Sequence, residues 1–414
     1  MKALQFQYSL PKLAMTRIAS SISASGFFGP WSPMSLADIP EPKLPARDWL
    51  LMRTALCGIC GSDAKQAFLK GARDNPVTAL ISFPHVLGHE MVGVVEQIGP
   101  GVRERKVGDR IVVNPWLSCG PRGIQPHCAA CQRGTFQLCE RFRDGNIAPS
   151  IHIGNCSDVA GGFAELVAVH ESCAFAIPDG MSWETAVLAD PFSVALHTVL
   201  QHPPQDIDGP ALVFACGTLG LLTIAILRAL HPDVPVVAIA RYPHQAELAR
   251  RFGAQDVLDD NAETAIERMA QITGSSVLQP WPPGKPWLWR GAGICYDTAG
   301  SPASVGLSLR MVSPRAKIVV SGVEAPRRFE WTPLYMKEAQ LIGSNAFGIE
   351  TFEGRRLHAM QIYFELVARG MDVTSIITHR FALADYKLAM LTLREKGKSG
   401  AVKALFTYEG GNAA

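Results

Sequence analysis

The sequence predicts an α/β protein that combines a doubly wound parallel sheet with a second, β-rich half. Three observations lead to this prediction. From about His202 onward, apolar strand-like runs alternate with amphipathic helix-like runs, which is typical of a doubly wound sheet. A glycine-containing turn at residues 215–220 lies between one such strand and the next helix. Before it, residues 92–95 and 110–113 are rich in β-branched side chains and are separated by glycine turns, a pattern typical of strands.

The other predicted elements follow from the same local patterns. Further strands of the β-rich half are predicted at residues 2–6, 49–55, 166–169 and 401–408. The six strands of the parallel sheet are predicted at residues 211–214, 236–240, 256–258, 293–296, 317–321 and 340–344. Helices are predicted at residues 192–200, 244–252, 360–368 and 383–395. Because the last of these elements return to the β-rich half, that half is expected to be discontinuous in sequence.

Length and composition limit the class of protein. With 414 residues the chain is long enough for two to three domains of about 150 residues each. Its 39 basic and 37 acidic side chains nearly cancel, which argues against a dedicated nucleic-acid-binding or membrane-surface protein. Residues 1–13 lack the apolar core of a signal peptide, and glycines interrupt the longest apolar run, residues 211–230. We therefore expect a cytoplasmic enzyme with no nucleic-acid or membrane partner.

Potential metal ligands lie at both ends of the stretch from Cys57 to Glu90. A catalytic zinc usually takes three protein ligands from Cys, His and Asp or Glu, and it keeps a fourth position for water or substrate. Cys60 and His89 could supply two of these ligands. The third must come from another part of the chain or from the neighbouring Glu90.

A lobe at residues 119–139 carries a second group of possible ligands: Cys119, Cys128, Cys131 and Cys139. Four thiolates can close a tetrahedral zinc without leaving a reactive position, so such a site stabilises a loop and does no chemistry. Four nearby arginines would also allow a zinc-ribbon module that binds nucleic acid: Arg122, Arg133, Arg141 and Arg143. Because enzyme-like motifs surround the lobe, we favour a structural zinc site.

Three motifs, in this order, resemble those of the zinc-dependent medium-chain dehydrogenases, the alcohol and polyol dehydrogenase superfamily. They are Cys60-Gly61-Ser62-Asp63, Gly88-His89-Glu90 and Gly161-Gly162-Phe163-Ala164-Glu165. The resemblance covers nearly the whole chain. It implies a Rossmann domain and a discontinuous GroES-like catalytic domain, with zinc and NAD(P) interconverting an alcohol and its carbonyl by hydride transfer. Compared with the family pattern, the segment up to Pro33 is longer, and about six residues look inserted between Gly120 and His127.

The resemblance also implies roles for single residues. Ser62 matches the hydroxyl that relays the alcohol proton, although it could equally be a turn residue. Asp63 matches the carboxylate that orients the ligand histidine, here His89. Lys65 stands where some relatives carry a relay histidine, so the exit route of the proton stays open.

The third zinc ligand of the family falls at Asp190. The run from Asp190 to His197 is similar to the polyol-dehydrogenase version, with Asp in place of Glu. Pro191 suits the first turn of a helix, so Asp190 could instead be a helix cap. We expect Asp190 to complete the catalytic zinc site, with Glu90 as the substitute ligand.

The glycine turn is the candidate cofactor site. It matches G-x-G-x-x-G except that Ala215 replaces the first glycine. The residues expected at the pyrophosphate are Gly217, Thr218, Leu219 and Gly220. About 20 residues farther on, where NAD-binding folds carry an acidic residue for the ribose, the chain has Ala240 and then Arg241. Because Arg241 offers donors suited to a 2′-phosphate, we expect NADP in preference to NAD, unless its side chain points to solvent or lies over the adenine.

We predict a catalytic domain from residues 1–200 and 346–414 and a dinucleotide-binding domain from residues 201–345. The active site is expected in the cleft between them, in a homodimer or homotetramer with two zincs per chain. A tryptophan- and proline-rich insertion at residues 274–292 is interpreted as a packed surface loop, with contact to a partner or substrate as the alternative.

Two other classes share parts of this pattern. A zinc-free enone or quinone reductase has the same fold but would need neither Cys60, His89 nor the four-cysteine lobe. A non-catalytic binding protein derived from the fold would not need a complete set of zinc and relay residues. The substrate stays open, because the segment at Asp190 favours secondary alcohols or sugars, whereas the apolar residues between Phe68 and Phe83 favour a larger, apolar substrate.

Overall fold

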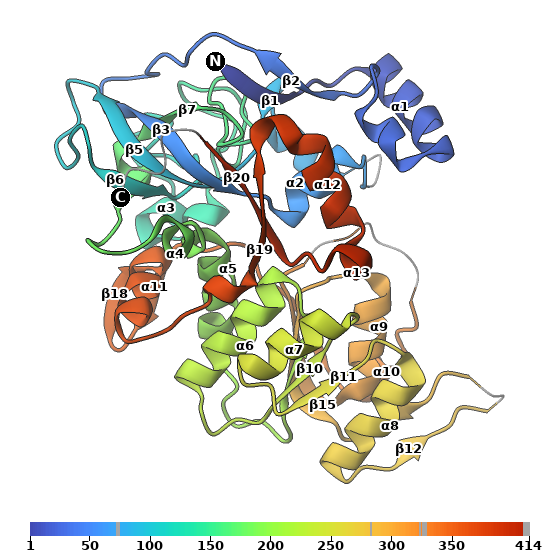
Figure 1. Ribbon diagram of the computed structural model, residues 1–414. Helices are drawn as coiled ribbons and strands as arrows, with labels where there is room; N and C mark the ends of the chain where they lie inside the picture. Colours follow the sequence, from blue (N-terminus) through green and yellow to red (C-terminus); the bar gives the residue numbers. More distant parts are fainter. Residues whose placement is uncertain (72–74, 282–283, 323, 325–328, 409–414) are drawn as a thin grey trace. The chain divides into compact units, whose positions relative to one another are not determined.

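The computed structural model describes residues 1–71, 75–281, 284–322, 324 and 329–408 (Figure 1). The chain divides into two compact units. Unit 1 contains Met1–Asp190 and Ile377–Ala414, and unit 2 contains Pro191–Ile376. The predicted domain boundaries lie after residues 200 and 345, so they differ from this division. Which residues belong to each functional domain stays a prediction.

The main sheet of unit 1 has strand β3 at its centre. In the described part of the chain the strand order is β19-β20-β3-β5-β6-β8, and β7 also pairs with β3. The strands are β3 (Trp49–Gly58), β5 (Glu90–Ile98), β6 (Arg110–Val113), β7 (Leu166–His170), β8 (Ala174–Ala176), β19 (Ile377–Ala382) and β20 (Lys403–Thr407). Only Arg53 of β3 is exposed, because this strand has neighbours on both edges and side chains packed on both faces. The C-terminal strand therefore returns to the centre of the N-terminal sheet, as the sequence predicts.

A smaller sheet and short helices complete unit 1. The sheet has the order β2-β1-β4, formed by β2 (Met34–Asp38), β1 (Lys2–Phe6) and β4 (His85–Val86). The helices are α1 (Leu10–Ile22), α2 (Gly61–Ala67), α3 (Ala129–Arg133), α4 (Trp183–Val187), α12 (Tyr386–Arg394) and α13 (Lys396–Ser399). Helix α5 (Ala189–Gln201) crosses the boundary between the units. Helix α1 was not predicted, because its stretch is rich in serine and alanine and lacks an inward-facing apolar stripe.

Unit 2 contains a parallel sheet of six strands in the order β11-β10-β9-β14-β15-β16 within the described residues. These strands are β9 (Ala211–Phe214), β10 (Val236–Ile239), β11 (Asp256–Leu258), β14 (Ala292–Asp297), β15 (Val312–Val320) and β16 (Gln340–Gly343). In chain order the sheet runs 3-2-1-4-5-6, the order of a Rossmann fold. All residues of β9 and β10 are buried, as expected for central parallel strands with both faces covered. The predicted fold class is confirmed.

The remaining elements of unit 2 are helices and two hairpins. The helices are α6 (Thr218–Leu230), α7 (Pro243–Arg251), α8 (Ala262–Thr273), α9 (Pro302–Met311), α10 (Thr332–Met336) and α11 (Ala359–Ala368). The hairpins pair β12 (Val277–Leu278) with β13 (Trp287–Leu288), and β17 (Ile349–Phe352) with β18 (Arg355–His358). The first hairpin lies in the predicted insertion, where the Trp281 side chain is 92% exposed; residues 282–283 of that insertion lie outside the described residues.

Candidate metal centre and cofactor turn

Cys60 lies where strand β3 leads into helix α2, and backbone hydrogen bonds fix its position. Its N–H donates to Asp63 Oδ2 at 2.9 Å, and the neighbouring Ile59 N–H donates to Ala404 O. Asp63 is the third residue of the helix and satisfies the cap N–H, as in a capping box. The run from Cys60 to Asp63 therefore forms a capped helix start that presents the thiol and buries the carboxylate.

His89 and Glu90 follow a tight glycine turn at the start of β5. Gly88 has a φ of +90°, and a Cβ there would lie 2.4 Å from the ring of Phe163. Only glycine fits this position without moving the ring. The Gly162 N–H donates to Gly88 O at 2.8 Å. The second and third motifs of the sequence thus pack directly against each other, and the third holds the turn that carries the histidine.

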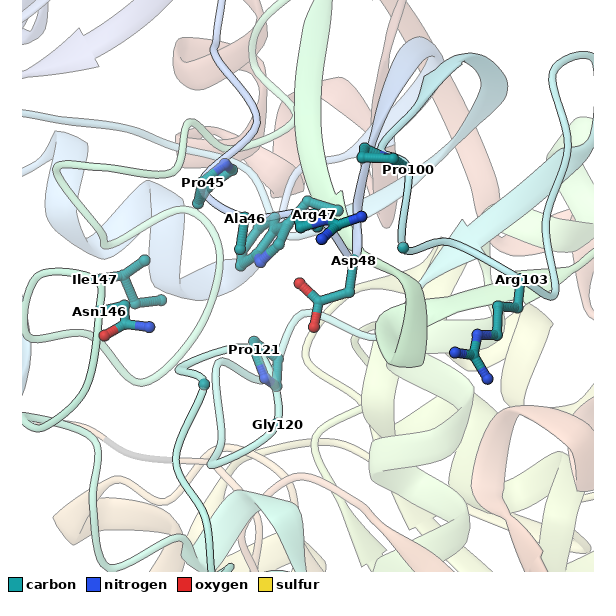
Figure 2. A pocket seen from close by; sticks show the side chains of 13 residues that line it. Pro45, Ala46, Arg47, Asp48, Pro100, Arg103, Gly120, Pro121, Asn146 and Ile147 are labelled. Atoms are coloured by element: carbon teal, nitrogen blue, oxygen red, sulfur yellow. The ribbon is translucent and has the colours of Figure 1, made fainter.

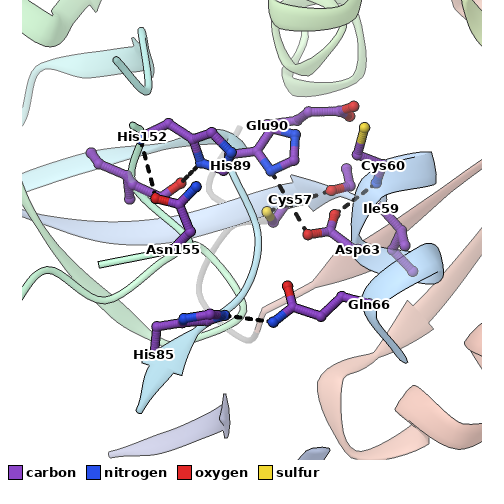
Figure 3. A network of polar contacts seen from close by, with 12 residues as sticks. Cys57, Ile59, Cys60, Asp63, Gln66, His85, His89, Glu90, His152 and Asn155 are labelled. Atoms are coloured by element: carbon purple, nitrogen blue, oxygen red, sulfur yellow. Dashed lines mark hydrogen bonds and ion pairs between the residues drawn. The ribbon is translucent and has the colours of Figure 1, made fainter. Parts of the chain in front are cut away.

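Cys60, His89 and Glu90 come together at the ends of these strands (Figure 3). One ligand atom from each residue lies within 4.8 Å of the others. The Cys60 side chain is partly exposed, whereas His89 and Glu90 are buried. A thiolate, an imidazole and a carboxylate are ligands that zinc takes in catalytic sites. The three residues therefore fit a metal site that is open on the side of the thiol.

Asp63 gives His89 a strongly negative environment. Its Oδ1 lies 3.7 Å from His89 Nδ1, which is too long for a hydrogen bond but close enough for charge attraction. Among the described residues, this nitrogen has no hydrogen-bond partner. Burial alone would lower the pKa of His89, but the charges of Asp63, Cys60 and Asp190 raise that pKa well above its ordinary value. Such a pocket favours a bound cation.

Glu90 also forms a buried ion pair with Lys403 of β20, which sequence reasoning missed. Lys403 Nζ contacts Glu90 Oε2 and donates to Ile59 O at 3.3 Å, and both charged side chains are at most 3% exposed. The contact with Lys403 uses one of the two carboxylate oxygens of Glu90, Oε2. No motif marks Lys403; only the pairing of β20 with β3 brings it to the site.

Asp190 lies outside the compact group. It is in the first turn of α5, which begins at Ala189, so Asp190 is not the cap residue that the alternative interpretation required. Its side chain is buried, and among the described residues its Oδ2 has no hydrogen-bond partner. Burial raises the pKa of Asp190 to about 7. A buried carboxylate oxygen without a partner keeps Asp190 as a second candidate for the metal.

His152 packs against His89 and was also missed. The ring centroids of the two histidines are 4.7 Å apart, and Trp116 stands edge-on to His152 at 5.8 Å. His152 Nδ1 lies 2.5 Å from Ile153 O, so the N–H is on Nδ1 and Nε2 keeps its lone pair. Burial lowers the pKa of His152 to about 3, which keeps the ring neutral. A hydrogen-bond acceptor therefore lies beside the candidate ligand; a single histidine in a loop gave no signal for it in the sequence.

Ser62 is exposed in the first turn of α2, two residues after Cys60. Its role as a proton relay stays a prediction.

The four cysteines of the lobe converge on one point. The Cys119 and Cys139 sulfurs are 3.7 Å apart, those of Cys128 and Cys139 are 3.9 Å apart, and all four lie within 4.8 Å of one another. A tetrahedral zinc with bonds of about 2.3 Å to sulfur requires sulfur–sulfur distances of about 3.8 Å. The contact with Cys139 lowers the pKa of Cys131 to about 5. The four thiols therefore fit a structural zinc.

Arg122 holds the lobe together from inside the apparent insertion. Its side chain is fully buried. It donates hydrogen bonds to the backbone oxygens of Leu117, Asp144, Ile147, Ala148 and Ser150, at 2.7–3.1 Å. A guanidinium that is used in this way cannot contact phosphate. This finding removes Arg122 from the nucleic-acid alternative and gives it a structural role.

A pocket of about 540 Å³ opens between the lobe and the beginning of β3 (Figure 2). Arg47 and Asp48 line it from one side and Gly120 and Asn146 from the other. The Asp48 carboxylate is hydrogen-bonded to His170 Nε2 at 3.1 Å. The candidate metal ligands do not line this pocket, so we assign it no part in the chemistry.

In unit 2 the turn after β9 has the geometry of a phosphate-binding loop. A Cβ on Gly220 would lie 1.9 Å from Ala215 O, whereas nothing lies within 4 Å of a Cβ placed on Gly217. Gly220 thus allows close packing, and Gly217 faces open space at the start of α6. The first turn of α6, with Thr218 and Leu219, presents backbone N–H groups toward that space. These features fit a pyrophosphate.

Ala240 and Arg241 directly follow strand β10. Ala240 is buried, and the Arg241 side chain is 67% exposed and paired through Nε with Asp260. An exposed ion pair of this kind contributes about 0–1 kcal/mol. The guanidinium therefore has further N–H donors for a phosphate. Weakening its ion pair with Asp260 would cost little free energy.

A Rossmann sheet with a glycine turn, together with a Cys–His–carboxylate group and a four-cysteine lobe, defines a metal- and dinucleotide-dependent oxidoreductase. Family models agree: residues 46–179 match the alcohol dehydrogenase GroES-like domain, and residues 218–361 match the zinc-binding dehydrogenase domain. The chain belongs to the zinc-binding dehydrogenases of the medium-chain dehydrogenase/reductase superfamily. It is therefore an enzyme that oxidises alcohols or reduces the corresponding carbonyls with a nicotinamide cofactor.

Individual relatives span nearly the whole chain. Sorbitol dehydrogenase of Bacillus subtilis (strain 168) is 26% identical over 357 residues, which cover 86% of this chain and 89% of that protein. (R,R)-butanediol dehydrogenase of Saccharomyces cerevisiae is 28% identical over 368 residues, covering 84% and 88%. A zinc-binding dehydrogenase of Sinorhizobium meliloti 1021 bound to NADP has a TM-score of 0.68 at 25% identity, covering 91% and 96%. Among the described residues, no helix is long and apolar enough to cross a membrane.

The turn at Ala215 generates a prediction about stability. Ala215 has a φ of +73°, a left-handed conformation that costs a residue with a Cβ about 1 kcal/mol. Ala215→Gly should therefore raise the free energy of unfolding by about 0.5–1 kcal/mol, measured by denaturant titration. Ala238→Gly in strand β10 is the matched control, and it should destabilise the protein. A loss of stability in both variants would show that Ala215 carries no strain.

Arg122 generates a second prediction. Arg122→Met leaves several buried carbonyl oxygens without a donor, so it should lower the free energy of unfolding by at least about 3 kcal/mol. The thiols of the metal-free lobe should also react faster with a thiol reagent. Arg143→Met, an exposed arginine of the same lobe, should change stability by less than about 0.5 kcal/mol. Equal, small effects of the two substitutions would contradict the structural role of Arg122.

Proposed function

We propose that this enzyme oxidises a secondary, polyol-like alcohol, or reduces the corresponding ketone, with NADP(H) and a catalytic zinc. The observation that carries the proposal is the group of Cys60, His89 and Glu90, which is open on one side and bordered by the neutral acceptor His152. Because His152 can accept a hydrogen bond near the proposed metal, the site suits a substrate that carries a further hydroxyl beside the one that reacts. The relatives named for sorbitol and butanediol act on alcohols of this kind.

When bound, zinc polarises the substrate oxygen as a Lewis acid, and the nicotinamide exchanges a hydride with the substrate carbon. Ser62 takes the hydroxyl proton from the substrate and passes it toward solvent, which its exposed position supports. Asp63 lies beside His89 Nδ1 and orients the imidazole. His152 Nε2 accepts a hydrogen bond from the neighbouring hydroxyl of the substrate.

For the metal, we propose Cys60, His89 and Glu90 as the catalytic ligands and the four cysteines of the lobe as the second, structural site. Geometry supports Glu90, because one of its carboxylate oxygens lies within 4.8 Å of the ligand atoms of Cys60 and His89. Asp190 remains the competing third ligand that the sequence favoured, and its unpartnered Oδ2 supports it.

We further propose a homodimer or homotetramer in the cytoplasm. Strand β16 is at the edge of the parallel sheet and its residues are largely exposed. An open edge of this kind can pair with the same strand of a second copy. All ten cysteines are free, which suits a reducing compartment.

The proposed activity is tested with a panel of alcohols and ketones by cofactor absorbance. Vicinal diols should give a higher kcat/KM than primary alcohols of the same length, because His152 can bind the second hydroxyl. His152→Phe should lower kcat/KM for the diols by about tenfold, the loss of one hydrogen bond in a buried site, and leave simple secondary alcohols nearly unchanged. Failure of all alcohols and ketones to turn over would refute the function itself; equal losses for both substrate types would refute only the role of His152.

Metal analysis tests the two sites, and wild type should hold two zincs per chain. Cys128→Ser/Cys131→Ser should remove one zinc, and Cys60→Ser should remove the other. Cys173→Ser and Cys295→Ser, buried cysteines outside both groups, should keep both. A single zinc that depends only on Cys60 would remove the structural site.

The same measurement identifies the third catalytic ligand. Glu90→Gln is combined with Lys403→Met, because it would otherwise leave a buried ammonium unpaired. This double variant should lose the catalytic zinc, whereas Asp190→Ala should keep it. The reverse result, with zinc lost in Asp190→Ala and kept in the double variant, would establish Asp190 as the ligand.

The cofactor preference is tested by kcat/KM for NADP and NAD. A charge-assisted hydrogen bond contributes about 1.5–3 kcal/mol, so Arg241 should favour NADP by about 10- to 100-fold. Ala240→Asp/Arg241→Leu should reverse the preference. Arg268→Leu, which removes another exposed arginine paired with an aspartate in unit 2, should not change it. A wild-type preference for NAD, or a ratio unchanged by the double substitution, would contradict the assignment.

A further inference from the structure

Several large apolar residues of helix α1, the N-terminal helix labelled in Figure 1, are exposed. Leu10, Ile18 and Ile22 are 67%, 60% and 85% exposed. Together with Ala14 they are spaced four residues apart, so they form one stripe along the outer side of the helix. Met15, next to this stripe, is 40% exposed. The matched family domain begins at residue 46, so this helix lies outside it.

Polar contacts keep the stripe turned outward. Thr16, on the opposite side of α1, is fully buried, and its hydroxyl donates to Trp31 O at 2.9 Å. Leu13 packs against the core on the same side. Because these contacts occupy the inner side of the helix, the apolar stripe cannot turn into unit 1 without breaking them.

The surroundings of the stripe are aromatic and basic. The side chains of Tyr8 and Trp31 are 58% and 55% exposed, and the hydrogen bond from Thr16 places the Trp31 backbone against the helix. Residues 1–38 contain two lysines, one arginine and one acidic residue, Asp38, which pairs with Lys2. Lys12 and Arg17 are the basic residues of the helix itself. Arg17 is exposed at the border of the stripe. An exposed apolar stripe with a basic residue at its border, and aromatic side chains next to the helix, are typical of helices that lie in a membrane interface.

We propose that α1 binds the surface of a membrane that contains anionic phospholipids. The stripe inserts among the acyl chains near the headgroups, and Arg17 contacts lipid phosphate. A second copy of the chain fits less well: a helix of 13 residues is about 20 Å long and about 10 Å wide, so its outer side is much smaller than the roughly 800 Å² that each partner contributes to a stable interface. The near-zero net charge of the whole chain, which led us to expect no membrane contact, averages over this local basic segment.

Vesicle flotation tests the proposal on the full chain. Wild type should float with vesicles of phosphatidylcholine and phosphatidylglycerol in equal parts, and much less with phosphatidylcholine alone. Leu10→Ser/Ile18→Ser/Ile22→Ser should lower binding by at least about tenfold. Arg17→Glu should lower binding to the anionic vesicles, and added salt should do the same to wild type. Lipids brominated on their acyl chains should quench tryptophan fluorescence in wild type more than in Trp31→Phe.

Matched controls and the mass in solution complete the test. Val107→Ser/Leu388→Ser removes two other apolar side chains of unit 1, each 58% exposed, and should leave vesicle binding unchanged. Thermal unfolding and alcohol oxidation of the triple variant should match those of wild type. Wild type that does not float with either vesicle, or a triple variant that floats equally well, would overturn the proposal. A triple variant with a smaller oligomer than wild type would instead identify a second copy of the chain as the occupant.

Discussion

The buried ion pair between Glu90 and Lys403 is the constraint on which the candidate metal centre depends. The two residues are 313 positions apart, so the pair forms only after the C-terminal strand β20 has joined the sheet beside β3. Strand β3 passes between them with Gly58, where a Cβ would lie 2.1 Å from Glu90 Oε2 and 2.9 Å from Lys403 Cε. A side chain at this position would separate the charges. The packing of three strands therefore positions the carboxylate beside Cys60 and His89.

Much of the fold could be predicted because its signals are local. Strands such as β9 and β6 are short runs of apolar, β-branched residues, and their predicted bounds agree with the structure. The turn at Gly217 and the start at Cys60 are recognisable because glycines and capping residues must occupy fixed positions in them. Helix α1 could not be predicted in this way, because its stretch is rich in serine and alanine and carries few large apolar residues.

The candidate site was predictable only where the chemistry itself fixes the residue types. Cys60 and His89 stand in recognisable motifs, so the sequence could identify them as candidate ligands. Lys403 and His152 carry no motif, since their roles come from contacts across the sheet and between rings. The sequence and the structure also rank Asp190 and Glu90 differently as the third metal ligand. The resemblance to the family favoured Asp190, whereas the three-dimensional distances bring Glu90 to Cys60 and His89.

The charges around the metal group also connect metal binding to folding. Asp63, Glu90 and Asp190 are all buried, and Cys60 adds a thiol to the same region. In the described part of this pocket, Lys403 and His89 are the positive groups that face them. Burial of unpaired carboxylates is costly, as the raised pKa of Asp190 shows. A divalent cation at the proposed site would remove this cost only when β3, β5 and β20 are all in place, so the proposed metal would stabilise the assembled sheet as well as the substrate.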